Sequence, residues 1–263
     1  MVKIFIDPGH GGSDSGAIGN GIQEKNITLA VAIRVKNLLL SRYSNVEVKM
    51  SRTGDTFPSL SDRTNAANAW GAHFYLSIHI NSGGGTGFED YIFPGSGAPT
   101  SIYQNTIHAE IMKQVDFVDR GKKQSNLHVL RESRMPAILT ENGFIDKAED
   151  AVKLKNSAYL DKIALGHVNG LAKAFHLTEK PPVNNPNTGN GKGFYRLVTG
   201  TFPDEQTQLA AADAVRKKTG WIIYPYKSGG LRLTTGVFTS LASAQKAKAI
   251  LEKEFGYIVY IKS

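Results

Sequence analysis

The sequence predicts an α/β protein, in which a twisted, mainly parallel sheet flanked by helices is followed by a small α+β unit. Two patterns lead to this prediction. Over residues 1–177, short apolar runs alternate with stretches of helical period, the βαβα rhythm of a parallel sheet. Over residues 194–263, a segment repeats itself with an offset of 36 residues.

The expected elements of the first part follow one another at short intervals. In chain order they are a strand at 3–7, a helix at 24–42, a strand at 46–50, a helix at 60–70, strands at 74–80 and 89–93, a helix at 101–118, a buried strand at 137–140 and a closing helix at 158–175. Strands joined through helices run parallel, and helices then cover both faces of the sheet. Functional residues are expected outside the carboxyl ends of such strands.

A boundary between two domains lies at residues 178–193, TEKPPVNNPNTGNGKG. Pro, Asn and Gly replace apolar residues there, and neither a helical nor a strand period continues. The prolines favour an extended chain and the Gly-Asn end a flexible one. We therefore expect a linker between a domain at 1–177 and a second domain at 194–263.

The second domain is built of two similar halves. YRLVTGTF at 195–202 aligns with LRLTTGVF at 231–238, and GWIIY at 220–224 aligns with GYIVY at 256–260. Each copy reads as a strand, an Ala- and Lys-rich helix and another strand, so the pair predicts a ferredoxin-like βαββαβ unit. A unit this small and regular indicates a binding module.

Charge and composition limit the possible functions. The net charge is +8, with 19 basic and 17 acidic side chains over residues 1–177 but 10 and 5 over residues 194–263. The basic second domain favours a polyanionic partner such as nucleic acid, acidic lipid or an anionic cell wall. The chain has no cysteine, so a metal site must use His and carboxylate ligands.

The sequence also bears on location. No apolar run approaches the length of a membrane helix, and Met1-Val2-Lys3 leads straight into IFID without the pattern of a Sec signal peptide. We expect no transmembrane segment, and a protein that leaves without a Sec signal if it acts outside a cell.

Three segments that could carry chemistry lie at expected strand ends. His10 stands in the glycine-rich loop IDPGHGGSDSGAIG, Glu24 begins the next helix, and His79 closes the strand SIHIN. Two imidazoles and one carboxylate can hold a zinc ion and leave one position open for water, which is a hydrolytic arrangement. The alternative is that each is a hydrogen-bonded core or loop residue, but adjacent parallel strands would bring all three to one edge.

A fourth segment, MPAILTENGF, reads as a buried strand that ends at Glu141. A carboxylate at the mouth of a sheet is costly unless it is solvated, paired or functional. Beside a metal site it can accept a proton from water and pass it to a leaving amine. The alternative is a helix cap or an ion-pair partner.

These segments resemble a known family. IDPGHGG, the pair Glu24-Lys25, SRTGD with SLSDRTNAAN, SIHIN and PAILTENGF resemble, in order and spacing, the zinc-dependent N-acetylmuramoyl-L-alanine amidases of the amidase_3 family over residues 1–177. The resemblance implies one Zn²⁺ per chain held by His10, Glu24 and His79, with Glu141 as the catalytic carboxylate. It implies cleavage of the amide between N-acetylmuramic acid and L-alanine in peptidoglycan.

The second domain resembles the SPOR domain, a peptidoglycan-binding module, through FYRLVTGTF, GLRLTTGVF and FGYIVYIK. The resemblance implies binding to glycan strands stripped of peptides. Tyr195, Tyr224, Tyr226 and Tyr260 are candidates for stacking on sugars, although any of them can instead face the core. RNA-binding domains share this topology. Lys192-Gly193-Phe194 begins like one of their motifs, but it falls on the first strand instead of the third, so we expect no nucleic-acid partner.

Further polar residues are candidates for supporting roles. Four of them are candidates either for supporting a ligand imidazole or for contacting substrate, namely Asp14, Arg63, Asn81 and His128, of which Asn81 and His128 are proposed as substrate contacts. Structural roles explain them equally well, and Arg52 and Arg63 are expected to pair with nearby Asp residues. Four histidines without motif context are expected at the surface or as satisfied helix residues, namely His73, His108, His167 and His176.

Some members of this family carry an inserted helix that covers the zinc until an activator binds. The stretch between SIHIN and LHVLRESRMPA has room for one helix and shows no such insertion, so an open site is expected. A wall substrate without a Sec signal implies a protein made in the bacterial or phage-infected cytoplasm that acts on the cell wall after release. The two roles that fit are mother-cell lysis in a spore-forming bacterium and a phage or prophage endolysin. The alternative function is a noncatalytic peptidoglycan-binding protein, and the oligomeric state is left open.

Overall fold

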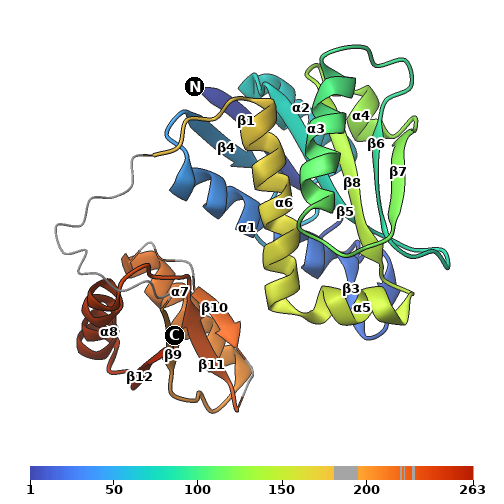
Figure 1. Cartoon of the computed structure of the whole chain (residues 1–263). Helices are drawn as coiled ribbons and strands as arrows, with labels where there is room; N and C mark the ends of the chain where they lie inside the picture. The colour runs from blue at the N-terminus through green and yellow to red at the C-terminus, as the bar shows by residue number, and fades with distance from the viewer. Residues whose placement is uncertain (181–194, 220, 222, 227–228, 263) are drawn as a thin grey trace. The chain divides into compact units, whose positions relative to one another are not determined.

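The computed structural model describes residues 1–180, 195–219, 221, 223–226 and 229–262. The chain divides into two compact units, Met1–Pro181 and Pro182–Ser263. Figure 1 shows the first in blue to yellow and the second in orange to red.

The first unit is built on a six-stranded sheet with the order β4-β1-β5-β8-β6-β7. Its strands, in chain order, are β1 Val2–Pro8, β4 Val46–Met50, β5 Phe74–Asn81, β6 Phe88–Ile92, β7 Asp119–Gln124 and β8 Ala137–Phe144. Neighbours are parallel except β6 and β8, which are antiparallel. The prediction of a mainly parallel sheet is confirmed.

Helices cover both faces of this sheet. On one face lie α1 Glu24–Arg42, α3 Thr100–Met112 and α6 Ser157–Ala174, which share an apolar core with alternate strand residues such as Ile4 and Leu76. On the other lie α2 Leu60–Trp70 and α4 His128–Arg131, which pack on the intervening residues such as Phe5 and Tyr75. This two-faced burial follows from the period of a strand, and Figure 1 shows the layers.

Shorter elements complete the first unit. A two-stranded hairpin, β2 Ile18–Gly19 and β3 Ile22–Gln23, joins β1 to α1, and α5 Ala148–Lys155 precedes α6. Among the described residues, no helix combines the length and apolarity that crossing a bilayer requires.

The largest departure from the predicted elements lies at 101–118. α3 ends at Met112, and Val115 and Phe117 continue in non-helical chain that buries both side chains. Residues two positions apart lie on the same side of an extended chain but on different sides of a helix. Burying both Val115 and Phe117 therefore requires extended chain, and the helix ends before them. The chain then forms the edge strand β7, DRGKKQ, which was not predicted because it has no apolar alternation.

The strand expected at 137–140 is also longer than predicted. β8 runs to Phe144 because its polar residues keep pairing with neighbouring strands: His79 lies opposite Glu141 on one side and Glu89 opposite Glu141 on the other. Glu141 therefore lies within a strand and is fixed from both sides.

The beginning of the predicted linker needs correction. Thr178 donates its backbone N–H to Asn45 Oδ1 at 2.7 Å, and Lys180 donates its own to the Arg42 carbonyl at 2.7 Å. Thr178 to Lys180 thus pack on the first unit because their backbone groups find partners there. The rest of the predicted linker, 181–193, lies outside the described residues.

The second unit has βαββαβ topology. In chain order its elements are β9 Arg196–Thr199, α7 Glu205–Thr219, β10 Ile223–Tyr226, β11 Arg232–Thr235, α8 Leu241–Phe255 and β12 Val259–Lys262, with the antiparallel strand order β10-β11-β9-β12. Each element of the second half begins 36 residues after its counterpart, for example β11 at Arg232 after β9 at Arg196.

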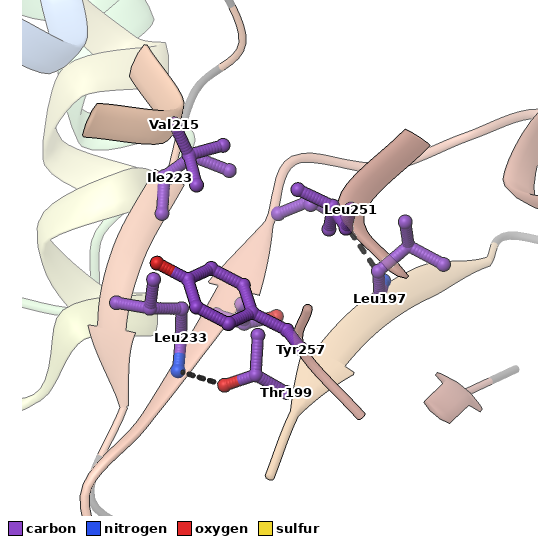
Figure 2. Close-up of a pocket in the computed structure, with 9 residues that line it drawn as sticks. Leu197, Thr199, Val215, Ile223, Leu233, Leu251 and Tyr257 are labelled. Atoms are coloured by element: carbon purple, nitrogen blue, oxygen red, sulfur yellow. Dashed lines mark hydrogen bonds between the residues drawn. The ribbon is translucent and has the colours of Figure 1, made fainter. Parts of the chain in front are cut away.

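Paired hydrogen bonds join the two halves. The Leu197 N–H donates to Thr235 Oγ1 at 3.0 Å, and the Leu233 N–H donates to Thr199 Oγ1 at 2.9 Å. The second bond is drawn in Figure 2, beside a cavity of about 10 Å³ that has room for at most one water. The repeat thus builds a small, nearly filled core.

A buried histidine makes the stability of the first unit depend on pH. His167 is fully buried on α6, where Nδ1 donates to the Ile163 carbonyl at 2.8 Å and Nε2 accepts from Thr140 Oγ1 at 3.0 Å. Burial lowers the pKa of His167 from 6.5 to about 4. Between these values the unfolded chain binds a proton that the folded chain does not, so stability falls as the pH drops below 6.5.

We predict that the free energy of unfolding falls by about 2 kcal/mol between pH 7.5 and pH 5 on account of His167 alone. Urea titrations at the two pH values measure this loss, and His167→Gln should lack it. The matched control His176→Gln, which changes an exposed histidine, should keep it. An equal loss in wild type and His167→Gln would contradict the assignment.

Candidate metal centre

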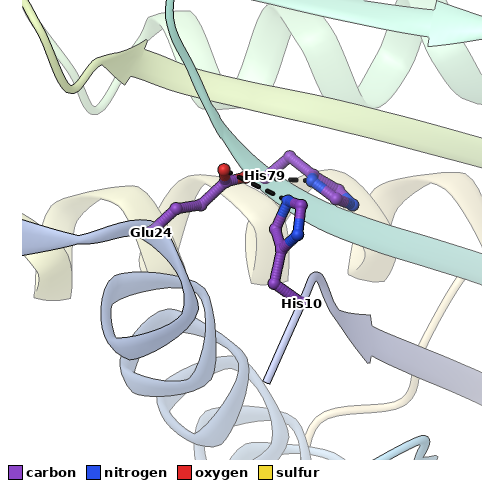
Figure 3. A group of neighbouring side chains, drawn as sticks. All are labelled: His10, Glu24 and His79. Atoms are coloured by element: carbon purple, nitrogen blue, oxygen red, sulfur yellow. Dashed lines mark hydrogen bonds and ion pairs between the residues drawn. The ribbon is translucent and has the colours of Figure 1, made fainter. Parts of the chain in front are cut away.

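Three side chains from three elements meet at the carboxyl edge of the sheet. His10 follows β1, Glu24 is the first residue of α1, and His79 stands near the end of β5. One ligand atom of each lies within 4.8 Å of the others. Figure 3 shows the Glu24 carboxylate facing both imidazole rings. The structure therefore brings together the three residues that the sequence predicted as ligands.

The Glu24 carboxylate organises the group. Its Oε2 lies 3.1 Å from His10 Nε2, and its Oε1 lies 3.0 Å from His79 Nδ1. Each oxygen also accepts a backbone N–H, from Ala17 and from Ile80, at 2.9 Å. Burial alone would raise the pKa of Glu24, but the hydrogen bonds from the two imidazoles outweigh it and hold the pKa well below its usual range.

Asp14 fixes the orientation of His10. The Nδ1–H of His10 donates to Asp14 Oδ2 at 2.8 Å, which turns Nε2 toward Glu24. Asp14 Oδ1 in turn accepts the Gly16 N–H at 3.0 Å. A carboxylate behind a histidine ligand sets its tautomer and raises its basicity, the usual support of a metal-binding imidazole.

Two glycines make room for these side chains. A Cβ on Gly9 would lie 2.3 Å from the His79 ring, and a Cβ on Gly16 would lie 2.6 Å from both Glu24 Oε2 and the His10 ring. Any other residue at either position would push a metal-centre side chain away. The glycine-rich sequence of this loop is therefore a packing requirement of the metal centre.

Two buried arginines hold the His10 loop from behind. Arg63 donates through Nη1 to Asp7 Oδ1 and through Nη2 to the His10 carbonyl, each at 2.8 Å. Arg52 donates through Nη2 to the Gly9 carbonyl at 2.8 Å. The expected pairing with Asp holds for Arg63, whereas the guanidinium of Arg52 donates mainly to carbonyls.

The donor set suits zinc. Zinc binds imidazole nitrogen and carboxylate oxygen at about 2.0–2.2 Å, so ligands that share one ion at tetrahedral angles lie roughly 3.4 Å apart. The Glu24 oxygens already lie 3.0 and 3.1 Å from the imidazole nitrogens. His10 and His79 keep 25% and 19% of their side chains exposed, which leaves an approach from solvent.

Glu141 lies on the strand next to His79. Its Oε2 is buried and has no hydrogen-bond partner among the described residues. Burial, and then the negative charges of Glu24 and Glu89, raise the pKa of Glu141 well above its usual value. Its position beside the donor set is that of a group able to carry a proton between a water and a leaving amine.

The proposed substrate contacts are dispersed. Asn81 donates through Nδ2 to Glu89 Oε1 at 2.7 Å, and His128 begins α4 with its Nε2 buried and unpartnered among the described residues. The four tyrosines belong to the second unit: Tyr195 and Tyr224 are partly buried, whereas Tyr226 and Tyr260 are 40% and 48% exposed. Of the histidines without motif context, His108 and His167 are buried and hydrogen-bonded, whereas His73 and His176 are exposed.

Sequence reasoning missed the group around Glu89. This side chain accepts from Asn81 at 2.7 Å, from the Tyr91 hydroxyl at 2.6 Å and from Arg120 Nε at 2.6 Å, and it also pairs with Lys123. Burial would raise the pKa of Glu89, but these bonds, led by that from Lys123, lower it to about 2. Two of the partners lie on β7, the strand that the sequence did not reveal.

Comparison with known proteins identifies the family. Residues 4–173 match Amidase_3, the N-acetylmuramoyl-L-alanine amidases. The chain belongs to this family. It is therefore an N-acetylmuramoyl-L-alanine amidase, as the resemblance implied.

Several relatives are similar over most of their length. The amidase is 64% identical over 179 residues to N-acetylmuramoyl-L-alanine amidase CwlM of Bacillus licheniformis, covering 68% of this chain and 71% of that one. It is 57% identical over 202 residues to the sporulation-specific N-acetylmuramoyl-L-alanine amidase of Bacillus subtilis, covering 77% and 76%. It is 44% identical over 183 residues to the endolysin of Bacillus phage SPP1, covering 67% of each.

The fold of the first unit is also known from a solved structure. The catalytic domain of CwlV, an N-acetylmuramoyl-L-alanine amidase from Bacillus (Paenibacillus) polymyxa, matches with a TM-score of 0.65 and 32% identity, covering 68% of this chain and 100% of that domain. The match agrees with the sheet and the helices described above.

Replacing Asp14 by alanine is expected to weaken zinc binding about tenfold to a hundredfold, because His10 loses the carboxylate that orients it. Competition against a chromophoric chelator measures this affinity without reference to catalysis. Asp213→Ala, which removes an exposed acidic side chain of the second unit, is the matched control and should bind zinc like wild type. Unchanged affinity in Asp14→Ala would contradict this role.

Proposed function

We propose that this amidase is a zinc-dependent peptidoglycan hydrolase that cleaves the amide between N-acetylmuramic acid and the L-alanine of the stem peptide. The observation that carries the proposal is the placement of Glu141, a buried carboxyl group in register with His79 of the donor set. Membership of the amidase family supports this amide as the bond that is cleaved. The position of Glu141 beside the donor set supports a hydrolysis in which a carboxyl group transfers the proton.

His10, Glu24 and His79 are the proposed ligands. When bound, zinc supplies a Lewis acid that polarises the scissile carbonyl and lowers the pKa of a water to near 7. The chain's own residues supply the rest: Asp14 orients the imidazole of His10, and Arg52 and Arg63 hold the loop that carries His10. This support costs no reorganisation during the reaction.

Glu141 is the proposed proton carrier. It accepts the proton of the attacking water as the new carbon–oxygen bond forms, and it returns that proton to the alanine nitrogen as the carbon–nitrogen bond breaks. The low polarity around it and the charges of Glu24 and Glu89 strengthen it as a proton acceptor. No covalent intermediate is required. A noncatalytic wall-binding protein would have no use for such a carboxyl group beside a complete donor set.

Glu141→Gln is expected to keep one zinc per chain but to lose activity by a factor of about 10²–10⁴, because the glutamine side chain cannot accept the proton of the attacking water. Release of L-alanine amino groups from peptidoglycan measures activity, and elemental analysis measures zinc. His79→Ala is the companion variant and should lose zinc. Near-normal activity in Glu141→Gln with zinc retained would refute the assignment of the base.

We propose that residues 194–263 form a SPOR-like domain joined by a linker at 181–193, and that it binds glycan strands without peptides. A groove of about 400 Å³ supports this, since its lining includes Arg232, Tyr257 and Tyr260. An exposed tyrosine can stack on a sugar ring, and the surplus of basic residues suits an anionic wall. Tyr195 and Tyr224 do not line this groove, so Tyr260 is the favoured contact.

Tyr260→Ala is expected to weaken binding to amidase-treated, peptide-free glycan about fivefold, the effect of losing one aromatic contact. Pelleting with insoluble glycan measures the dissociation constant. Tyr226→Ala is the matched control, because Tyr226 is also exposed but does not line the groove. Equal weakening in both variants, or in neither, would count against this groove as the binding site.

The biological role that we favour is lysis of the mother-cell wall during sporulation. The relative named sporulation-specific matches over a larger share of this chain, and at higher identity, than the phage endolysin does. We further propose that no activator is needed. Within the first unit α3 packs on α6, on the sheet face opposite to α2 and α4, so α3 is not available to cover the metal centre.

A further inference from the structure

Two basic side chains, Arg120 and Lys123, lie beyond Glu141 on the side away from the candidate metal centre. His79, Glu141 and Glu89 are paired residues of β5, β8 and β6, so their side chains form a row on one face of the sheet. The next strand, β7, adds Arg120 and Lys123, and both contact Glu89. The row therefore runs from a proposed metal ligand to a basic edge.

Arg120 and Lys123 can bind a further anion in addition to Glu89. The Glu89 carboxylate is nearly fully buried and already accepts hydrogen bonds from Asn81 and Tyr91 as well as from the two cations. Arg120 uses only Nε for it; its guanidinium also lies over the Phe144 ring, 4.9 Å from the centroid, and among the described residues Nη1 and Nη2 make no hydrogen bond. The side chains of Arg120 and Lys123 are 35% and 36% exposed, and with Glu89 they leave one net positive charge.

The spacing matches a particular group of the substrate. Arg120 Nε contacts Glu89, and Glu89 lies on β6 two strand spacings, or about 10 Å, from His79. Two extended residues span about 7 Å, and a hydrogen bond adds about 3 Å. A carboxylate on the second residue beyond the scissile amide would therefore reach the guanidinium.

We propose that Arg120 and Lys123 form a subsite for the free carboxylate of the second residue of the stem peptide. This residue is a D-glutamate joined to the next through its γ-carboxyl, so its α-carboxylate remains available. Arg120 offers the planar pair of nitrogens that binds a carboxylate through two bonds, and Lys123 adds charge. The subsite rests on the proposed function and gives the enzyme a preference for stems with an unamidated second residue.

The test compares two uncrosslinked glycan substrates with four-residue stems that differ only in whether the second residue is D-glutamate or D-isoglutamine. The whole zinc-loaded protein should cleave the acid form with a kcat/KM about tenfold higher than the amide form. In Arg120→Gln this ratio should fall to near one, mainly through a higher KM for the acid form. Lys123→Gln should lower the ratio in part.

Controls separate this role from support of the fold. Arg134→Gln removes an exposed cation from the segment that leads into β8 and should keep the wild-type ratio. Arg120→Lys keeps a charge beside Glu89 but not the paired nitrogens, so it should show an intermediate ratio at wild-type thermal stability. If Arg120→Gln slows both substrates equally, or if wild type does not discriminate, the subsite is refuted. If wild type releases alanine from neither substrate, the proposed function itself fails.

Discussion

The hydrogen bonds of the Glu24 carboxylate hold together the candidate metal centre at the carboxyl edge of the sheet. This carboxylate is almost fully buried, and its two oxygens are shared between two imidazoles and two backbone N–H groups. A buried charge is tolerated only with such complete pairing. The glycines at 9 and 16 and the arginines at 52 and 63 serve the same end, because they let the His10 loop approach Glu24 and keep it there.

The order of the strands distributes the chemistry along the sheet. The proposed metal donors come from the end of β1, from α1 and from β5. The proposed proton carrier, Glu141, follows on β8, and the charged group around Glu89 follows on β6 and β7. The register of β6 and β8 pairs Glu89 with Glu141, so the two carboxyl side chains are neighbours. The negative charge of Glu89 raises the proton affinity of Glu141. The two cations that contact Glu89, Arg120 and Lys123, are partly exposed to solvent.

Much of the first unit could be predicted because strong local signals mark it. The bounds of α1 and α2 agree with the sequence, and α2 begins with the capping box of Ser59 and Asp62. His10 and His79 could be expected to meet because β1 and β5 are neighbours and parallel. The edge strand β7 and the polar half of β8 could not be predicted, since they are held by pairing and not by apolar periodicity, and the Glu89 group was missed with them.

Zinc held by His10, Glu24 and His79 is proposed to drive cleavage at L-alanine. This is tested by release of N-terminal alanine and of reducing sugar from purified cell walls, before and after chelation and zinc add-back. Zinc-dependent amide cleavage should give new alanine amino groups that vanish with the chelator, return with zinc and appear without new reducing sugar. Alanine release that persists in metal-free protein, or an absence of release despite one bound zinc per chain, would contradict it.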